Sequence, residues 1–242
     1  ADTASHGYCQ NWHSAPYSNP TLAADAYDTG RTNFSSGANL LIAQVDGESI
    51  TSALHTGYDA SASATTTQYF KYKKEVAGTV TFQTVLYPMP EGTTATVKPT
   101  KITMNGTSDD TALASRVSVN DSSRPTVKTI YHYHSFESAP ATRSFDAFTT
   151  NAGTVTLVQD GSNKVHFVAL TGGTSISSGN NVVLNADFAL TDLAVSLENG
   201  VLYIESSDAS AAFSPITVNF NGQTVSEVYC NGNRMGFTQD SN

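Results

Sequence analysis

The segment Asn181–Ser207 reads NVVLNADFALTDLAVSLENGVLYIESS, and it decides the fold class that the sequence predicts. Alternating or short apolar runs between turn residues make up the segment, as in β-strands with one buried face. Asn199-Gly200 is the strongest short hairpin signal, because both residues tolerate a positive φ. The same dipeptide recurs at 105–106, 221–222 and 231–232. We therefore expect strands that are joined by tight hairpins.

Segments of the same character run along the whole chain, and helical periodicity is nearly absent. They lie at 39–45, 66–76, 78–88, 96–104, 127–136, 153–160, 164–171 and 215–232. Strands at this spacing are typical of a sandwich or barrel. Around 135–145, Pro140 and small residues interrupt the pattern. We predict an all-β fold with a large antiparallel β-sandwich at 1–138, followed by a smaller packed β-sheet subdomain at 139–242.

Composition and charge limit the class of partner. The chain has 242 residues, of which 14% are charged, and its formal net charge is −9. A strongly negative surface repels phosphates, so we expect no nucleic acid partner. No apolar run approaches the length of a membrane helix, and we expect no membrane span.

The chain starts without a basic or apolar leader segment, which favours a mature form or an excised fragment. Its Ser, Thr and Asn content is common among secreted proteins, so we expect an extracellular or periplasmic location.

The segment 6–16, HGYCQNWHSAP, combines two histidines, a cysteine and the chain's single tryptophan. Strand alternation places His6 and Trp12 on one face and Cys9 and His13 on the other. A metal site here would need His13 together with ligands from distant strands; otherwise His13 only forms hydrogen bonds. Cys9 and Cys230 form either a disulfide with each other or two buried free thiols, and the sequence leaves both alternatives open.

A second cluster, TIYHYHSF, occupies residues 129–136. On a strand, His132 and His134 share one face, and Tyr131 and Tyr133 share the other. Two imidazoles at this spacing can bind one metal ion, Zn or Ca, if a third ligand is present, and Glu137 is the nearest candidate. The alternative interpretation is a strand with a hydrated aromatic surface.

Aromatic and basic residues suggest sugar binding. Planar rings stack on the C–H faces of sugars, and Trp12, Tyr131 and Tyr133 are the candidates unless they are half-buried on sandwich faces. A local basic patch at Lys71 and Lys73 would otherwise be a solvated strand face. The residues that we expect to contact an anionic glycan are Arg31, Lys71, Lys73, Lys74 and Arg116.

Several segments occur in an order that resembles the β-sandwich region of the heparinase II/III-like polysaccharide lyases. They are H-x-Y-x-Q-x-W-H-x-x-P (6–16), RTNFSSGANLLI (31–42), LHTGYDAS (54–61) and YFKYKKEVAGTVTFQTVLYPMPEG (69–92). The segment VNFNGQTVSEVYCNGNRMGF (218–237) is similar to the C-terminal end of that family. The resemblance implies a sandwich that closes the substrate cleft beside a helical toroid, which carries most of the catalytic machinery and which we expect to be missing from this chain. It also implies that His13 matches a metal-associated histidine, which in an active lyase would be a candidate catalytic residue.

These observations lead to three functional hypotheses. The first is a carbohydrate-binding module that is an accessory part of a polysaccharide lyase and is not a complete enzyme alone. The second is the sandwich portion of an active lyase, which cleaves uronate-containing polysaccharide by β-elimination and needs a missing catalytic domain or chain. The third is a structural or adhesive surface domain. The sequence contains no G-x-S-x-G, H-E-x-x-H, P-loop or G-x-G-x-x-G motif.

Overall fold

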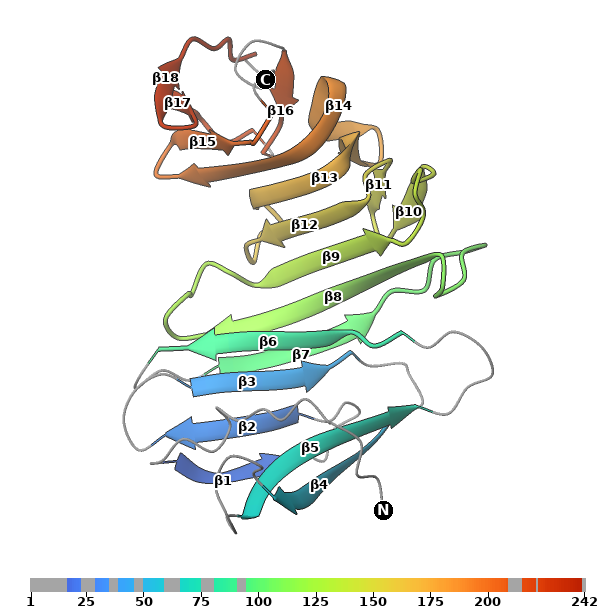
Figure 1. Cartoon of the computed structure of the whole chain (residues 1–242). Helices are drawn as coiled ribbons and strands as arrows, with labels where there is room; N and C mark the ends of the chain where they lie inside the picture. The colour runs from blue at the N-terminus through green and yellow to red at the C-terminus, as the bar shows by residue number, and fades with distance from the viewer. Residues whose placement is uncertain are drawn as a thin grey trace. The chain divides into compact units, whose positions relative to one another are not determined.

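The computed structural model shows a chain built of β-strands, and the predicted all-β class is confirmed (Figure 1). It describes residues 17–22, 29–34, 39–45, 50–58, 66–74, 81–90, 95–208, 215–220 and 222–240. Side chains are described for Val45 and, within these ranges, from residue 81 onward. The chain divides into two compact units, Ala1–Pro99 and Thr100–Asn242.

The first unit contains a four-stranded antiparallel sheet and a separate hairpin. The sheet has the order β1-β2-β3-β6. Its strands are β1 (Tyr17–Leu22), β2 (Thr29–Phe34), β3 (Asn39–Gln44) and β6 (Thr84–Met89). The hairpin joins β4 (Ile50–Tyr58) to β5 (Thr66–Lys74). Strand β7 (Ala95–Lys101) contains the boundary between the two units.

The second unit is formed by one large mixed sheet with the order β18-β17-β15-β14-β13-β12-β9-β8. Its neighbouring strands are antiparallel, except that β15 and β17 are parallel. The strands on this path are β8 (Ala112–Asp121), β9 (Thr129–Ser135), β12 (Thr154–Gln159), β13 (Val165–Ser178), β14 (Asn181–Glu198), β15 (Val201–Glu205), β17 (Glu227–Cys230) and β18 (Asn233–Met235). Three short strands lie beside it: β10 (Arg143–Phe145), β11 (Phe148–Thr150) and β16 (Ile216–Val218).

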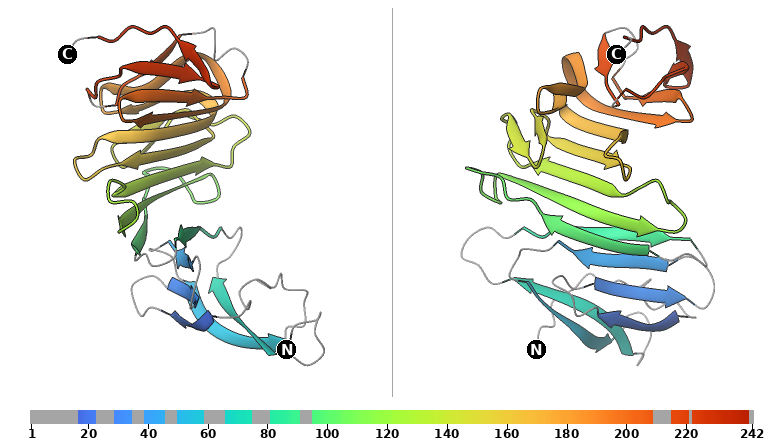
Figure 2. Two further views of the ribbon diagram at one scale, coloured as in Figure 1. Left: turned by 90° about the vertical axis from the view of Figure 1, so that its left-hand side faces the viewer. Right: turned by 180° about the vertical axis from the view of Figure 1, so that it is seen from behind.

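The long β13–β14 pair takes part in both layers of a sandwich-like arrangement. The first half of β13 pairs with β12 and its second half pairs with β11, while β14 pairs with β16 at one end and β15 at the other. The pair curls over in Figures 1 and 2. Gly172 has a φ of 65°, and a Cβ on Gly173 would lie 2.5 Å from the Cα of Ala152. These two glycines therefore allow the backbones to approach where the strand bends.

The core of the second unit lies between the two layers that the curled β13–β14 pair connects. Apolar residues that alternate along β12, β13 and β14 supply much of it, and Leu157, Val168 and Leu193 are almost fully buried. Phe145 and Phe148 of the β10–β11 hairpin cover the other side, where the ring of Phe145 stacks on that of Tyr133 at 5.1 Å. The sequence predicts a domain boundary at residue 138, within the segment 135–145. In the structure this segment is a connection within the second unit.

Each predicted strand segment overlaps an observed strand. In the 181–207 segment the turn lies at the predicted position, with Asn199 and Gly200 at φ values of 52° and 82°. Strand β8, at ten residues, is among the longest, yet no predicted segment covers it. Its second half alternates regularly, with Val117 and Val119 buried between exposed polar residues, so a period-2 signal was present there and was missed.

Candidate functional site

A polar pocket of about 600 Å³ lies in the second unit, at the end where the β10–β11 hairpin covers the sheet. The end of β7 and the loop that follows it form one wall, β8 contributes Arg116, and the start of β10 and its turn form another wall. The lining residues are Thr100, Lys101, Ile102, Thr103, Asn105, Gly106, Thr107, Arg116, Thr142, Arg143, Ser144 and Asp146. Hydroxyl, amide and cationic groups therefore dominate its surface.

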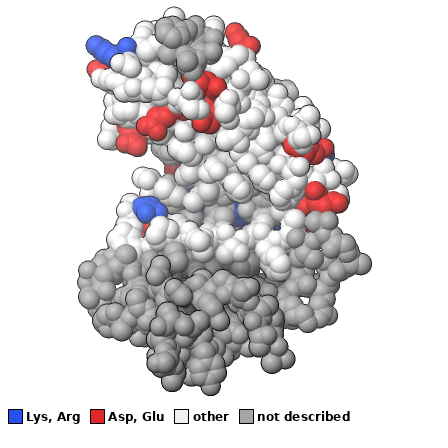
Figure 3. Space-filling view, in the orientation of Figure 1, with Lys and Arg blue, Asp and Glu red and all other residues white. Residues whose placement is uncertain are grey.

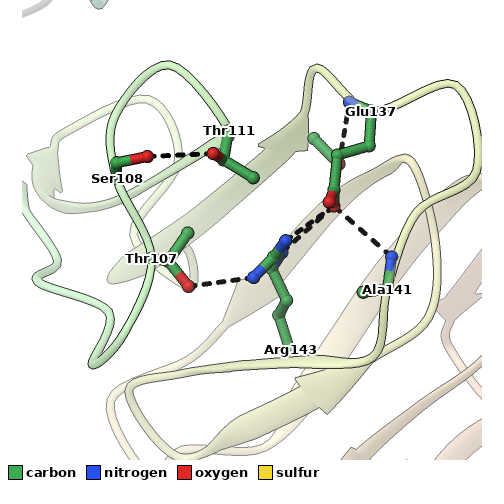
Figure 4. A network of polar contacts seen from close by, with 7 residues as sticks. Thr107, Ser108, Thr111, Glu137, Ala141 and Arg143 are labelled. Carbon is green, nitrogen blue, oxygen red and sulfur yellow. Dashed lines mark hydrogen bonds and ion pairs between the residues drawn. The ribbon is translucent and has the colours of Figure 1, made fainter.

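Arg143 is fixed by a hydrogen-bond network on the pocket wall (Figure 4). Its Nη2 and Nε donate to Oε2 of Glu137 at 2.8 and 3.3 Å, and its Nη1 donates to Oγ1 of Thr107 at 3.1 Å. The same Glu137 oxygen accepts from the Ser135 hydroxyl and the Ala141 backbone N–H. Hydrogen bonding from Arg143 lowers the pKa of Glu137. The guanidinium of Arg143 is thus held in one orientation that ties two loops together.

Arg116 is less constrained. Its Nη1 lies 3.8 Å from Oδ2 of Asp146, and 49% of its side chain is exposed. Asp146 begins the two-residue turn of the β10–β11 hairpin and adopts a φ of 50°, a conformation that Asp tolerates better than most residues. Beneath this pair, burial and then the Asp146 charge raise the pKa of Tyr131. Because Arg116 has five N–H donors, this arrangement leaves some of them for a ligand.

The pocket lining is more cationic than the protein as a whole. It includes Lys101, Arg116 and Arg143 but only one carboxylate, Asp146. Carboxylates just outside the lining balance two of these cations, since Lys101 pairs with Asp109 and Arg143 pairs with Glu137. In the space-filling view, acidic groups are spread over the described surface, and basic groups occur at few places (Figure 3). Within a chain of net charge −9, the lining and its neighbouring carboxylates are thus close to neutral together, and Arg116 is the most exposed of the three cations.

Two residues that the sequence suggests for sugar stacking lie inside the core. Tyr133 is 0% exposed and Tyr131 is 9% exposed, so neither ring forms the expected surface platform. Strand alternation separates the tyrosines from the histidines as predicted, and the tyrosine face is the one that the β10–β11 hairpin covers. The Tyr133 hydroxyl has no hydrogen-bond partner, the one such buried side-chain atom in the described residues.

The predicted metal pair is placed on the opposite face of β9. His132 and His134 lie on one face, but Glu137, the proposed third ligand, turns to Arg143. His132 Nδ1 lies 3.3 Å from the Thr156 hydroxyl, and the His134 ring packs edge-on against Phe136 at 4.7 Å. Desolvation, with a smaller contribution from His134, lowers the pKa of His132. Across the part of the chain that the structure describes, no three His, Cys, Asp or Glu side chains form a metal-binding group.

For the other predicted site residues, the structure describes either nothing or only the backbone. Trp12, His13 and Cys9 are outside the described residues. The backbone is described at Arg31 in β2 and at Lys71 and Lys73 in β5, but their side chains are not. Cys230 is a buried thiol, and desolvation raises its pKa.

Sequence reasoning found part of this pocket and missed the rest. It named Arg116 as a contact for an anionic glycan, and the structure places that residue in the pocket lining. It missed Arg143, which lies within the interrupted 135–145 segment. The sequence F-D-A-F at 145–148 does contain a signal for the β10–β11 hairpin. An Asp between two aromatic residues fits a two-residue turn that presents a carboxylate.

Comparison with protein-family models, with curated proteins and with solved structures finds no match to this chain. In the described residues, no helix has the length and apolar character that crossing a membrane would require.

Proposed function

We propose that this chain is a polysaccharide-binding module and that the pocket beside Arg116 takes the carboxylate of a uronate residue. The observation that carries the proposal is the half-exposed Arg116 guanidinium in a pocket lined by hydroxyl groups. A pocket of about 600 Å³ lies within the usual range for small-ligand sites and has room for part of a glycan chain.

Arg116 is the group that would contact the carboxylate. A guanidinium offers two parallel N–H donors whose spacing matches the two oxygens of a carboxylate. At 3.8 Å, its contact with Asp146 is longer than a normal charge-assisted hydrogen bond, so a ligand carboxylate can compete for the same donors. Arg143 has a positioning role, because its donors are used by Glu137 and Thr107.

The remaining lining groups suit a polyhydroxyl ligand. Thr100, Thr103, Thr107, Thr142 and Ser144 carry hydroxyls that can both donate and accept hydrogen bonds. Sugar hydroxyls have the same dual capacity, whereas an apolar ligand could not use the remaining hydrogen-bonding capacity of these groups.

An accessory role beside a polysaccharide lyase is supported by the sequence resemblance alone. In that arrangement the module holds uronate-containing polysaccharide while a separate catalytic domain or chain performs β-elimination. The isolated chain should then release no unsaturated uronate product from any substrate that it binds, and a rise in ultraviolet absorbance during incubation would contradict the accessory role.

The proposal is tested by calorimetric titration with oligogalacturonate, alginate oligosaccharides and their carboxyl-reduced forms. Wild-type protein should bind at least one acidic glycan, and carboxyl reduction should weaken that binding. Arg116→Ala should lower the affinity about tenfold or more, because it removes a charge-assisted contact. Lys164→Ala is the matched control, since it removes one positive charge from an exposed hairpin residue outside the pocket.

Two results would contradict a uronate site. One is equal binding of the acidic and the carboxyl-reduced glycans, and the other is equal loss of affinity in Arg116→Ala and Lys164→Ala. Rising salt should weaken binding by the wild type more than by Arg116→Ala, because screening acts on the contact that the variant lacks.

A further inference from the structure

The outer face of the second unit's sheet, opposite its core, carries a row of residues in register across five strands. The row consists of Phe167 on β13, Ser196 on β14, Tyr203 on β15, Tyr229 on β17 and Arg234 on β18. Their chain neighbours Val168, Val195, Leu202 and Val228 point into the core. Alternation therefore places this row on the surface.

Two tyrosine rings in this row, those of Tyr203 and Tyr229, stack on each other. Tyr203 is 40% exposed, and its ring lies nearly parallel to that of Tyr229, with 5.9 Å between centroids and 21° between planes. The Tyr229 hydroxyl donates to Glu227 Oε2 at 2.8 Å, and Arg234 Nη2 lies 3.4 Å from the other oxygen of that carboxylate. Tyr229 thus has a fixed orientation and supports one side of Tyr203.

On its other side, Tyr203 has a small neighbour in the row. Its register partner on β14 is Ser196, whose side chain is small, and the next large residue in the row is Phe167. Two strand spacings separate Tyr203 from Phe167, or about 9.5 Å. That distance leaves room for one saturated six-membered ring beside Tyr203, above the serine.

A shallow groove of about 450 Å³ lies next to this row, two residues further along the same strands and on the same face. Ala169 and Ala194, paired in register, form its small-residue floor, and Glu205 lies beside them on β15. Asn231 and Ser207 contribute further polar groups to its edge. A flat floor, an aromatic side and hydrogen-bonding groups along the edge are the features that bind a sugar ring.

The negative charge of the groove favours uncharged sugars over acidic ones. Asp192 and Glu205 line it, and hydrogen bonds from the Ser207 backbone and hydroxyl lower the pKa of Asp192, which keeps it ionised. No Lys or Arg is among the lining residues. Carboxylates accept hydrogen bonds from hydroxyl groups but repel a uronate, so the complementary ligand is an uncharged sugar.

From this geometry we infer a second glycan site, in which an uncharged pyranose stacks on Tyr203 and places its hydroxyls against Glu205 and Asn231. The site goes beyond the uronate pocket because it uses other strands, the other face of the sheet and the opposite charge. It does not require that pocket to bind anything.

The test is titration of the full chain with four neutral hexasaccharides, built from β-1,4-glucose, β-1,3-glucose, β-1,4-xylose and β-1,4-mannose. Wild-type protein should bind at least one of them. Tyr203→Ala should weaken that binding about tenfold, because stacking area and ring contacts are lost. Tyr203→Phe keeps the ring and should retain wild-type affinity. Phe136→Ala is the matched control, since it removes a 48% exposed ring that belongs neither to the row nor to the groove.

Different results separate this site from the uronate pocket. Arg116→Ala should leave neutral-glycan binding unchanged, and Tyr203→Ala should leave binding of acidic glycans unchanged. The inference is overturned if the wild type binds none of the four hexasaccharides, or if Tyr203→Ala and Phe136→Ala have the same affinity. It is also overturned if Tyr203→Phe loses binding to the same extent as Tyr203→Ala, because the ring would then not be the contact.

Discussion

Replacing Tyr133 by Phe should stabilise the protein, although the substitution removes a polar group from its core. The Tyr133 side chain is 0% exposed, its ring stacks on Phe145, and its hydroxyl has no hydrogen-bond partner. In the unfolded chain the same hydroxyl is hydrogen-bonded to water. Folding therefore strips it of water without replacement, and burial raises the pKa of Tyr133 for the same reason.

The size of the effect follows from two opposing contributions. A buried polar group without a partner costs about 1–3 kcal/mol. Phe retains the ring and its stacking, and it loses only the few dispersion contacts of one oxygen atom, each worth about 0.1–0.2 kcal/mol. We expect the free energy of unfolding to rise by about 1 kcal/mol, which corresponds to roughly 2–4 °C in Tm for a chain of this size.

The matched comparison is Tyr131→Phe, two residues earlier on the same face of β9. The Tyr131 hydroxyl lies within the electrostatic influence of the charged groups of Asp146 and Arg116, so removing it should lower the free energy of unfolding by up to about 1 kcal/mol. Urea unfolding, followed by near-ultraviolet circular dichroism, measures both variants, and the m-value should be the same in each.

The two substitutions make the same chemical change and should have opposite signs. A lower midpoint for Tyr133→Phe would refute the reasoning, because it would show that the hydroxyl is satisfied in solution, for example by a buried water. Equal destabilisation in both variants would have the same meaning.

Three further predictions concern the fold and its acid sensitivity; thermal unfolding measures the first two, and acid unfolding measures the third. Gly173→Ala should destabilise by about 1–3 kcal/mol, since the new Cβ would meet the backbone of Ala152 at 2.5 Å, whereas Gly236→Ala, which has open space, should be neutral. Leu157→Ala should cost about 2–5 kcal/mol, because the side chain is fully buried. The pKa of Glu137 is below its ordinary 4.5, so its contribution is present above pH 4.5 and is lost as the pH falls through the lower folded value. Glu137→Gln should flatten that part of the acid-unfolding curve, and an unchanged curve would contradict the assignment.

The sequence predicted local geometry well where one residue pattern determines it. Asn199-Gly200 and Asn231-Gly232 both adopt positive φ at hairpin turns, as the dipeptide indicates. On β9 the pattern correctly separates Tyr131 and Tyr133 from the two histidines, because side chains alternate along any strand.

The same pattern could not tell which face of β9 is buried. That depends on the β10–β11 hairpin, which places Phe145 and Phe148 over the tyrosines. Either face of β9 would have been compatible with the composition of the strand. The partner that decides between them lies later in the chain, and its contact is a tertiary one that no local period reports.

The position of the pocket that we propose as a uronate site follows from where this hairpin ends. Arg116 is in register with Tyr131, so it belongs to the face of the sheet that forms the core. Two residues earlier on that face, Ala114 is buried beside Tyr133. The β10–β11 turn at Asp146 stops short of fully covering Arg116, which therefore keeps half of its side chain in solvent and needs no fully buried partner. The length of one three-residue hairpin strand thus determines whether this position is core or binding site. A hairpin longer by one residue pair would extend over the guanidinium and bury a charge that only Asp146 could then balance.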